Sequence, residues 1–252
     1  MLGESGIHNA EREARWLLEA APDDPDAALD LARRRAAGEP LQYLTGLAGF
    51  RRLELRIGPG ALVPRPETES LAGRAIEVVP AGGTVLDLGT GAGPIALSVA
   101  DERPDANVIA TDISEEALVW ARLNRDELGL GVEFVCCDLF EGLPSHLRHG
   151  VDVVVANPPY VSEGERNSLP TEVVTHEPGV ALFASRDGLE IFERIAVGAR
   201  GWLRPGGFLL SEIGDRQGKT VTRLLDFLGY SEVTIRPDLV GRPRIAEGLW
   251  RP

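Results

Sequence analysis

The chain has 252 residues, of which 43% are hydrophobic and 26% are charged. This balance is typical of a soluble globular protein, and no apolar run approaches the roughly 18 residues that a membrane-spanning helix needs. The formal net charge of −13 excludes binding to nucleic acid through overall charge, because an acidic surface repels phosphate backbones. Residues 1–10 contain no basic segment followed by an apolar run. We expect a cytoplasmic protein that binds neither membranes nor nucleic acid directly, and we expect it to be a monomer.

The first part of the chain predicts helices followed by a hairpin. Residues 9–49 show helical patterning, which Gly38-Glu39-Pro40 interrupts because glycine ends helices and proline cannot continue them. Residues 50–63 alternate around Gly58-Pro59-Gly60, which predicts a β-hairpin with a Gly/Pro turn. The segment Pro64-Arg65-Pro66-Glu67-Thr68-Glu69 is typical of a rigid loop that opens a helix. We divide the chain into a small helical domain, a hairpin linker with the proline-rich loop, and a main domain, at 1–49, 50–70 and 71–252.

From residue 84 onwards, short apolar strands alternate with helices. Such alternation predicts an α/β fold, in which a mostly parallel sheet is covered by helices on both faces. The predicted strands are 84–88, 107–111, 132–136, 151–156 and 208–213. The predicted helices are 94–102, 115–128, 189–199 and 218–228. Two further strands, 232–235 and 244–250, follow one another without a helix, which predicts an antiparallel addition at the sheet edge.

The strand at 84–88 runs into Gly89-Thr90-Gly91-Ala92-Gly93, a glycine-rich turn that leads into a helix. Glycines let the backbone approach a ligand closely, but many nucleotide-binding proteins share such turns, so the motif alone is weak. Polar residues also end the next three strands, namely Asp112, Asp138 and Asn157. At that edge of an open α/β sheet, Asp112 can reach a ribose, and Asp138 can accept from an adenine amino group. The series predicts bound S-adenosyl-L-methionine, with a plain nucleotide-binding fold as the alternative.

The tetrapeptide Asn157-Pro158-Pro159-Tyr160 follows a strongly apolar strand. A nitrogen conjugated to a π-system is a poor nucleophile, because its lone pair is delocalised. The Asn157 side-chain oxygen and the Pro158 carbonyl can accept from both of its N–H groups, which favours pyramidalisation as positive charge develops. Tyr160 offers a flat face for stacking. The motif predicts methylation of a planar nitrogen, with S-adenosyl-L-homocysteine as product and Asn157, Pro158 and Tyr160 as catalytic residues; alone, it would be a simple Asn-Pro turn.

Together these motifs resemble the HemK/PrmC-type protein-(glutamine-N5) methyltransferases, which modify peptide-chain release factors. The resemblance covers nearly the whole chain, in segments that begin at Gly38, Leu62, Asp87, Asn157, Glu177, Asp187, Glu212 and Gly241. It implies a Rossmann-like class I methyltransferase fold, with a seven-stranded sheet whose last strand is antiparallel. It also implies that a small helical domain docks the protein substrate, and that the methylated glutamine lies in a Gly-Gly-Gln loop of the release factor.

The resemblance also assigns residues to the expected site. Cofactor contacts are implied for Gly89, Thr90, Gly91, Ala92, Gly93, Asp112, Leu139 and Asn157, to which we add Asp138 from its place at a strand end. The glutamine amide would be held by Asn157, Pro158, Pro159 and Tyr160. The adjacent Cys136 and Cys137 predict neither a disulfide nor a zinc site, and we expect no metal. His176 receives no role.

Three other functions stay open at this point. The helical region before Gly38 is shorter than in typical family members, which would suit a paralogue that methylates a small molecule or another protein. A DNA adenine N6-methyltransferase shares Asn-Pro-Pro-Tyr, but the net charge of −13 and the lack of a base-reading domain count against it. The third is a non-catalytic cofactor-binding module, against which the intact Asn157 and Tyr160 argue.

Overall fold

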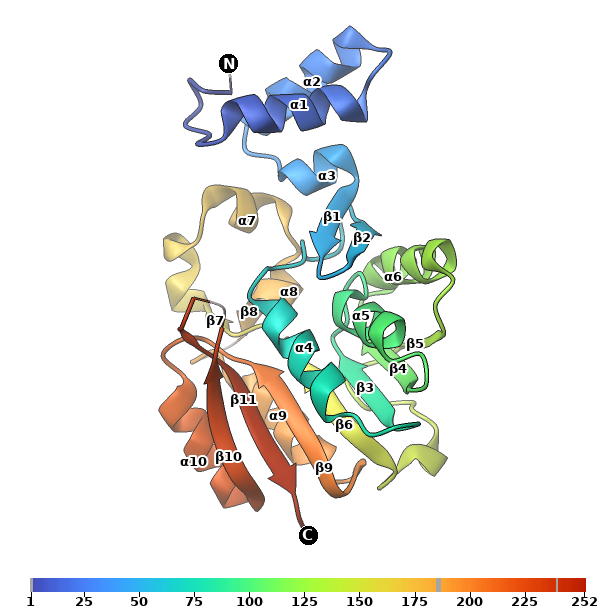
Figure 1. Ribbon diagram of the computed structural model, residues 1–252. Helices are drawn as coiled ribbons and strands as arrows, with labels where there is room; N and C mark the ends of the chain where they lie inside the picture. Colours follow the sequence, from blue (N-terminus) through green and yellow to red (C-terminus); the bar gives the residue numbers. More distant parts are fainter. Residues whose placement is uncertain (1, 185–186, 239) are drawn as a thin grey trace.

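The computed structural model describes residues 2–184, 187–238 and 240–252. Its centre is a seven-stranded sheet with the order β10-β11-β9-β6-β3-β4-β5 (Figure 1). The strands are β3 (Thr84–Leu88), β4 (Asn107–Asp112), β5 (Val132–Cys136), β6 (Val151–Ala156), β9 (Leu203–Glu212), β10 (Tyr230–Pro237) and β11 (Pro243–Trp250). Only β11 is antiparallel to its neighbours. The predicted α/β fold, with an antiparallel last strand, is therefore confirmed.

The last two strands form the antiparallel addition at the sheet edge that the sequence predicted, and within it β11 lies between β9 and β10. Burial explains this order. Every residue of β11 after Pro243 is buried, whereas most residues of β10 are exposed or only partly buried. A strand that is buried along its length needs hydrogen-bond partners on both sides, so β11 takes the inner position. The edge strand is β10, which runs parallel to the other five.

Helices cover both faces of the sheet. On one face lie α4 (Thr68–Val78), α5 (Pro94–Glu102) and α6 (Glu115–Leu128), and on the other lie α9 (Glu190–Ala199) and α10 (Gly218–Leu228). Neighbouring residues of a strand point to opposite faces. Val85 and Val153 accordingly pack with α4 and α5, while Leu86 and Val154 pack with α9. Both faces of the central strands are thus apolar, and polar side chains that could bind a ligand lie at the strand ends.

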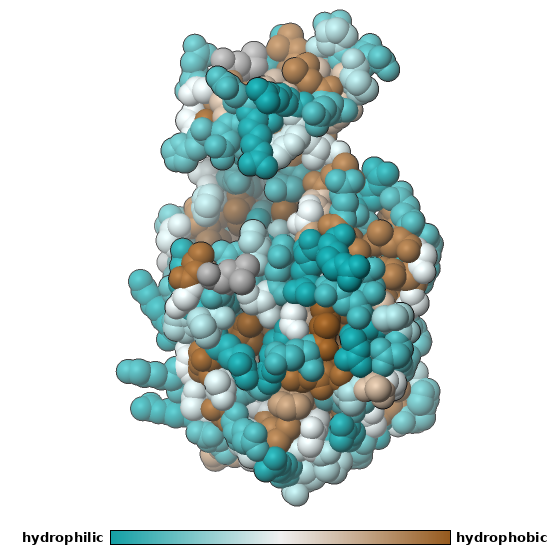
Figure 2. Space-filling model, viewed as in Figure 1, coloured by the Kyte–Doolittle hydropathy of each residue, from teal (hydrophilic) through white to brown (hydrophobic). Residues whose placement is uncertain are grey.

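The N-terminal helices form a small unit that projects from the main body (Figures 1 and 2). They are α1 (Ala10–Ala20), α2 (Pro25–Ala36) and α3 (Leu41–Thr45). Their shared core centres on Leu17 and Leu44, which are almost fully buried. The face seen in Figure 2 is mostly hydrophilic, with apolar groups scattered among polar ones. None of the helices in the described ranges combines the length and apolarity that a membrane crossing requires.

The hairpin is real, but its turn is not the Gly/Pro run. It pairs β1 (Leu47–Phe50) with β2 (Leu53–Arg56), and Arg51 and Arg52 form the turn. Arg51 adopts a left-handed φ of 52°, and its backbone N–H donates to the Glu69 carboxylate at 3.1 Å. Gly58 serves close packing instead, because a Cβ there would lie 2.4 Å from the Trp120 ring. The predicted turn was wrong because Gly58 is required for close packing against α6. The residues next to it in the sequence do not reveal this long-range contact.

The connection from β6 to α9 is long and crosses the top of the sheet (Figure 1). It contains β7 (Val161–Ser162), the 3-10 turn at Glu163–Ser168, α7 (Thr171–His176), α8 (Gly179–Leu182) and β8 (Phe183–Ala184), while a second 3-10 turn, Ser145–Leu147, precedes β6. Arg35 of α2 ties this connection to the N-terminal helices, since it bonds Glu13 at 2.6 Å and Glu172 at 2.8 Å. Two further arginines in this part of the chain are also paired with carboxylates: Arg34 with Glu39, and Arg51 with Glu102.

The packing of α4 on the sheet depends on a buried ion pair. Arg74 donates two hydrogen bonds to Glu247 of β11, at 2.8 and 2.6 Å, and the Glu247 side chain is only 7% exposed. Replacing Arg74 by methionine should lower the free energy of unfolding by about 2–3 kcal/mol, because Glu247 keeps only the half-exposed Arg236 as partner. Urea denaturation measures this loss. Glu77→Ala is the matched control, since it removes the exposed partner of the same arginine and should cost about 0.5 kcal/mol or less.

Candidate functional site

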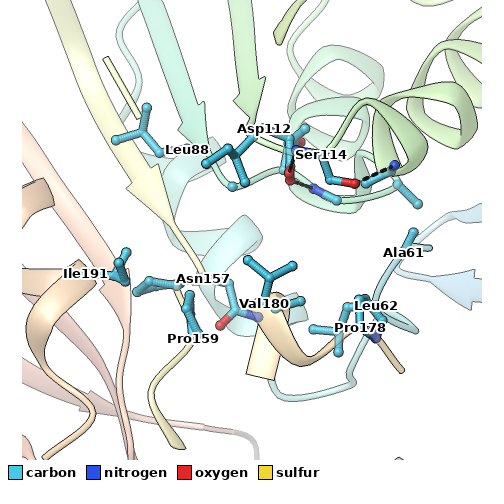
Figure 3. Close-up of a pocket in the computed structure, with 18 of the residues that line it drawn as sticks. Ala61, Leu62, Leu88, Asp112, Ser114, Asn157, Pro159, Pro178, Val180 and Ile191 are labelled. Carbon is cyan, nitrogen blue, oxygen red and sulfur yellow. Dashed lines mark hydrogen bonds between the residues drawn. The ribbon is translucent and has the colours of Figure 1, made fainter. Parts of the chain in front are cut away.

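One cavity lies at the carboxyl ends of β3, β4 and β6. Its volume is about 1160 Å³, including the part that opens to solvent. Asp112 and Ser114 lie on one side of it, and Asn157, Pro159 and Val180 lie across from them (Figure 3). The glycine turn after β3 is also part of the wall. The structure therefore brings together polar residues from three strand ends, as the sequence predicted.

The glycine turn is anchored to the end of the neighbouring strand. The backbone N–H groups of Gly89 and Thr90 both donate to the Thr111 carbonyl, at 2.8 and 2.9 Å. The N–H of Gly91 donates to Oδ2 of Asp112 at 2.8 Å. Gly91 has a φ of 59°, a left-handed conformation that glycine adopts without strain. These bonds hold the turn flat against the cavity, where its backbone can approach a ligand.

Asp112 lines the cavity and also shapes it. Its second oxygen accepts from the N–H of Ser114 at 2.9 Å, and Ser114 in turn caps α6 by accepting from Ala117. Burial raises the pKa of Asp112, and the three backbone N–H bonds act against that rise. One carboxylate thus joins the glycine turn, the end of β4 and the start of α6.

Asp87 was not assigned a role from sequence, but the structure places it directly behind the turn. The residue is fully buried, and its Oδ2 accepts from the Thr90 hydroxyl at 2.6 Å and from the Ala96 N–H at 3.2 Å. Its other oxygen has no hydrogen-bond partner among the described residues. Burial raises the pKa of Asp87 to about 7. An anion that is poorly solvated at this point would favour a cationic group in the cavity.

Two residues from the end of β5 complete the far side. Asp138 and Leu139 both line the cavity. Asp138 is paired with Arg194 of α9 through Oδ2 at 2.8 Å, which leaves its Oδ1 able to accept another hydrogen bond. Leu139 has a left-handed φ of 52°, and its carbonyl accepts from the Thr111 hydroxyl at 3.0 Å. The bend at Leu139 turns the chain across the mouth of the cavity.

The Asn157 amide belongs to a buried hydrogen-bond network. Its Nδ2 donates to the Thr68 hydroxyl at 3.1 Å, and that hydroxyl donates to Oε2 of Glu212 at 2.7 Å. The Tyr160 hydroxyl donates to the other Glu212 oxygen at 3.2 Å. Thr68 is 2% exposed and Glu212 is 1% exposed. Sequence reasoning missed the roles of Thr68 and Glu212, although both stand in the segments that carried the family resemblance.

Two of the expected site residues do not line the cavity. Tyr160 lies beside it, with its hydroxyl on Glu212 and with the Arg244 guanidinium 5.7 Å from its ring centroid. Gly93 begins α5, and a Cβ there would lie 2.9 Å from Leu97. Stacking of Tyr160 on a substrate therefore stays a prediction. The other expected residues, Gly89, Thr90, Gly91, Ala92, Asp112, Asp138, Leu139, Asn157, Pro158 and Pro159, all line the cavity.

An ion pair, which we call the clasp, joins two segments that line the cavity. Arg65, in the proline-rich loop, bonds both oxygens of Glu177, at 2.7 and 2.8 Å, and the Glu177 side chain is only 2% exposed. Pro178 and Val180, which follow Glu177, line the cavity (Figure 3). The neighbouring His176 is not part of the lining. Segments more than 110 residues apart in the chain are thus joined over the site.

The described residues include no group of three or more metal-ligating side chains, and Cys136 and Cys137 are both free. The cavity is mostly apolar, and the polar groups that line it include the Asp112 and Asp138 carboxylates and the Asn157 amide. Such a site can orient a planar N–H donor and can stabilise positive charge.

Comparison with known proteins agrees with this geometry. The Methyltransferase small domain family matches residues 71–180. The chain is 42% identical to the release factor glutamine methyltransferase of Streptomyces coelicolor, over 92% of this chain and 84% of that protein. It is equally 42% identical to the protein of the same name from Neisseria gonorrhoeae, over 92% of this chain and 85% of that protein.

Solved structures support the fold. A methyltransferase from Pyrococcus furiosus superimposes with a TM-score of 0.58 at 21% identity, covering 79% of this chain and 90% of that one. The likeness shows a methyltransferase fold, while the curated relatives show the family. The chain belongs to the release factor glutamine methyltransferase family.

Proposed function

We propose that this enzyme transfers a methyl group from S-adenosyl-L-methionine to N5 of a glutamine, in the Gly-Gly-Gln motif of a peptide-chain release factor. The main support for the proposal is that the Asn157 side-chain oxygen is available to accept a hydrogen bond in the cavity. Asn157 lines the cavity, its nitrogen is already bound to Thr68, and no described residue donates to its oxygen. That oxygen is the acceptor that a planar NH₂ group requires.

The residues present fit S-adenosyl-L-methionine. The glycine turn allows close approach to its amino acid part, and Asp112 stands at the strand end where a ribose diol is bound in related α/β sheets. The buried Asp87 carboxyl has a pKa raised to about 7 and one oxygen unpartnered among the described residues, and its ionised form would suit a sulfonium cation. Apolar side chains of Ile113 and Leu139 line the same cavity and can contact an adenine.

In the proposed mechanism, Asn157 and Pro158 hold the side-chain amide of the substrate glutamine. S-adenosyl-L-methionine, when bound, supplies an electrophilic methyl group. Asn157 Oδ1 and the Pro158 carbonyl accept the two N–H bonds of the glutamine amide and direct its lone pair at that methyl group. These bonds strengthen as positive charge develops on nitrogen, which is where stabilisation lowers the barrier. With S-adenosyl-L-methionine bound, a nitrogen–carbon bond would form as its sulfur–carbon bond breaks, S-adenosyl-L-homocysteine would leave, and the acidified nitrogen would release one proton to solvent.

We assign substrate docking to the projecting helices of residues 1–49. Trp16, Leu18 and Leu29 of this small unit are exposed apolar residues, at 37%, 58% and 40%. The Arg35–Glu172 pair connects the same unit to the chain segment that follows Asn-Pro-Pro-Tyr. A protein substrate can use such a surface, whereas a small molecule has no need of it, and this favours the release factor over the small-molecule alternative.

Nucleic acid is a poorer substrate for this surface. The net charge is −13, and Arg34, Arg35 and Arg51 are each paired with a carboxylate rather than free for phosphate. DNA adenine methylation, which the Asn-Pro-Pro-Tyr motif alone would allow, is therefore not our choice.

Label transfer tests the function directly. The protein is incubated with isotopically labelled S-adenosyl-L-methionine and a release factor, and the label is mapped by mass spectrometry; we expect one methyl group on the Gly-Gly-Gln glutamine. Asn157→Ala should lower turnover roughly 10²- to 10³-fold, as loss of an acceptor in the transition state does elsewhere. Asn107→Ala, at the opposite end of β4, is the control and should turn over normally. Label found only on DNA or on a small metabolite would refute the proposal.

Cofactor binding is tested at Asp112. Asp112→Ala removes both the acceptor for the Gly91 N–H and the carboxylate at the ribose position. The Kd for S-adenosyl-L-homocysteine, measured by calorimetry, should rise roughly 10- to 100-fold, the equivalent of one or two charge-assisted hydrogen bonds. Asp126→Ala, which removes an exposed carboxylate of α6, should leave the Kd unchanged. A Kd for Asp112→Ala within twofold of wild type would contradict the assignment.

A further inference from the structure

The Asn157 amide has two orientations of nearly the same shape, and only one suits the reaction. With its oxygen towards the substrate, it accepts an N–H from the glutamine amide. With its nitrogen there instead, two donors would face each other and the nitrogen to be methylated would be repelled. Some feature of the protein must therefore select the orientation.

The Thr68 hydroxyl provides that feature, because it carries a single proton. Its oxygen lies 2.7 Å from Glu212 Oε2, and an ionised carboxylate can only accept. The hydroxyl proton of Thr68 is therefore used in the hydrogen bond to Glu212, and towards its other neighbour the Thr68 oxygen can only accept. That neighbour is Asn157 at 3.1 Å, which must offer its NH₂ group.

Two hydroxyl donors favour the ionised, accepting state of Glu212 against the effect of its burial. Burial raises the pKa of Glu212, but hydrogen bonds from Thr68 and Tyr160 and the nearby Arg244 act against that rise, while Glu67 adds to it. The Tyr160 hydroxyl donates to Oε1, so each carboxylate oxygen accepts a hydrogen bond from a neighbouring hydroxyl. Glu212 does not line the cavity and lies behind Thr68, which does.

We propose that Thr68 and Glu212 are positioning residues: Glu212 accepts from Thr68, so that Thr68 must accept from Asn157 and the Asn157 oxygen is turned to the substrate nitrogen. This inference rests on the proposed function, since it needs a substrate N–H donor at Asn157. It assigns a task to a buried carboxylate and a buried hydroxyl that the transfer mechanism does not otherwise use.

Four variants test the relay at a mildly alkaline pH. Thr68→Val removes the hydroxyl at constant shape, and Thr68→Ser keeps it. Glu212→Gln introduces an NH₂ group, which lets the Thr68 proton turn towards Asn157. Ser70→Ala is the matched control on α4, because its buried hydroxyl has no partner among the described residues.

We expect Thr68→Val and Glu212→Gln each to lower kcat/KM for the release factor roughly 10- to 100-fold, below the loss for removal of Asn157 itself. The Kd for S-adenosyl-L-homocysteine should stay within twofold of wild type in both. Thr68→Ser should retain at least a third of the activity, and Ser70→Ala all of it. The double variant Thr68→Val/Glu212→Gln should be no slower than Thr68→Val, because the carboxylate acts only through the hydroxyl.

Two results would overturn the relay. One is wild-type kcat/KM for Thr68→Val, and the other is a double variant whose loss equals the product of the two single losses. Thermal melts show whether each variant is folded; if Glu212→Gln is not, the comparison of Thr68→Val with Thr68→Ser still decides. A wild-type enzyme that labels no glutamine would instead refute the proposed function, and the inference with it, so the two failures are distinct.

Discussion

The site depends on the way in which the glycine turn after β3 is anchored to β4. Two backbone N–H groups donate to the Thr111 carbonyl, and a third donates to the Asp112 carboxylate. The parallel pairing of β3 with β4 brings these groups together, since Leu88 lies opposite Thr111. The sheet register therefore sets the floor of the cavity, and the fully buried Asp87 carboxyl lies beneath it. A shift of one residue would remove all of these contacts at once.

The opposite side of the cavity is assembled from parts that are distant in sequence. Asn157 ends β6, Thr68 begins α4, and Glu212 ends β9. Their meeting point requires α4 to lie across β6 and β9, and the Arg74–Glu247 pair also ties α4 to β11. The Arg65–Glu177 clasp joins the same proline-rich loop to the segment that covers the cavity. Residues 64–74 thus position Asn157 through Thr68, the segment that follows Glu177 through Arg65, and helix α4 through Arg74.

The predictable parts of the molecule are those whose chemistry is local. The glycine turn and Asn157 could be recognised because each follows an apolar strand directly, and parallel strands end at one edge. Thr68 and Glu212 could not be paired from sequence, since they are 144 residues apart and meet only after α4 packs on the sheet. The hairpin turn was misplaced because Gly58 serves its contact with Trp120. β11 takes the inner position because it is buried along its length. The sequence pattern of a strand does not show which of two neighbouring strands lies inside the sheet.

The central claim is that Asn157 and Pro158 hold a glutamine amide by its two N–H groups. A crystal structure of the enzyme with S-adenosyl-L-homocysteine and a Gly-Gly-Gln release-factor fragment tests it most directly. We predict the glutamine nitrogen at hydrogen-bond distance, about 2.7–3.2 Å, from both Asn157 Oδ1 and the Pro158 carbonyl, with Asn157 Nδ2 still on Thr68. A glutamine bound elsewhere in the cavity, or an Asn157 amide turned away from it, would contradict the account.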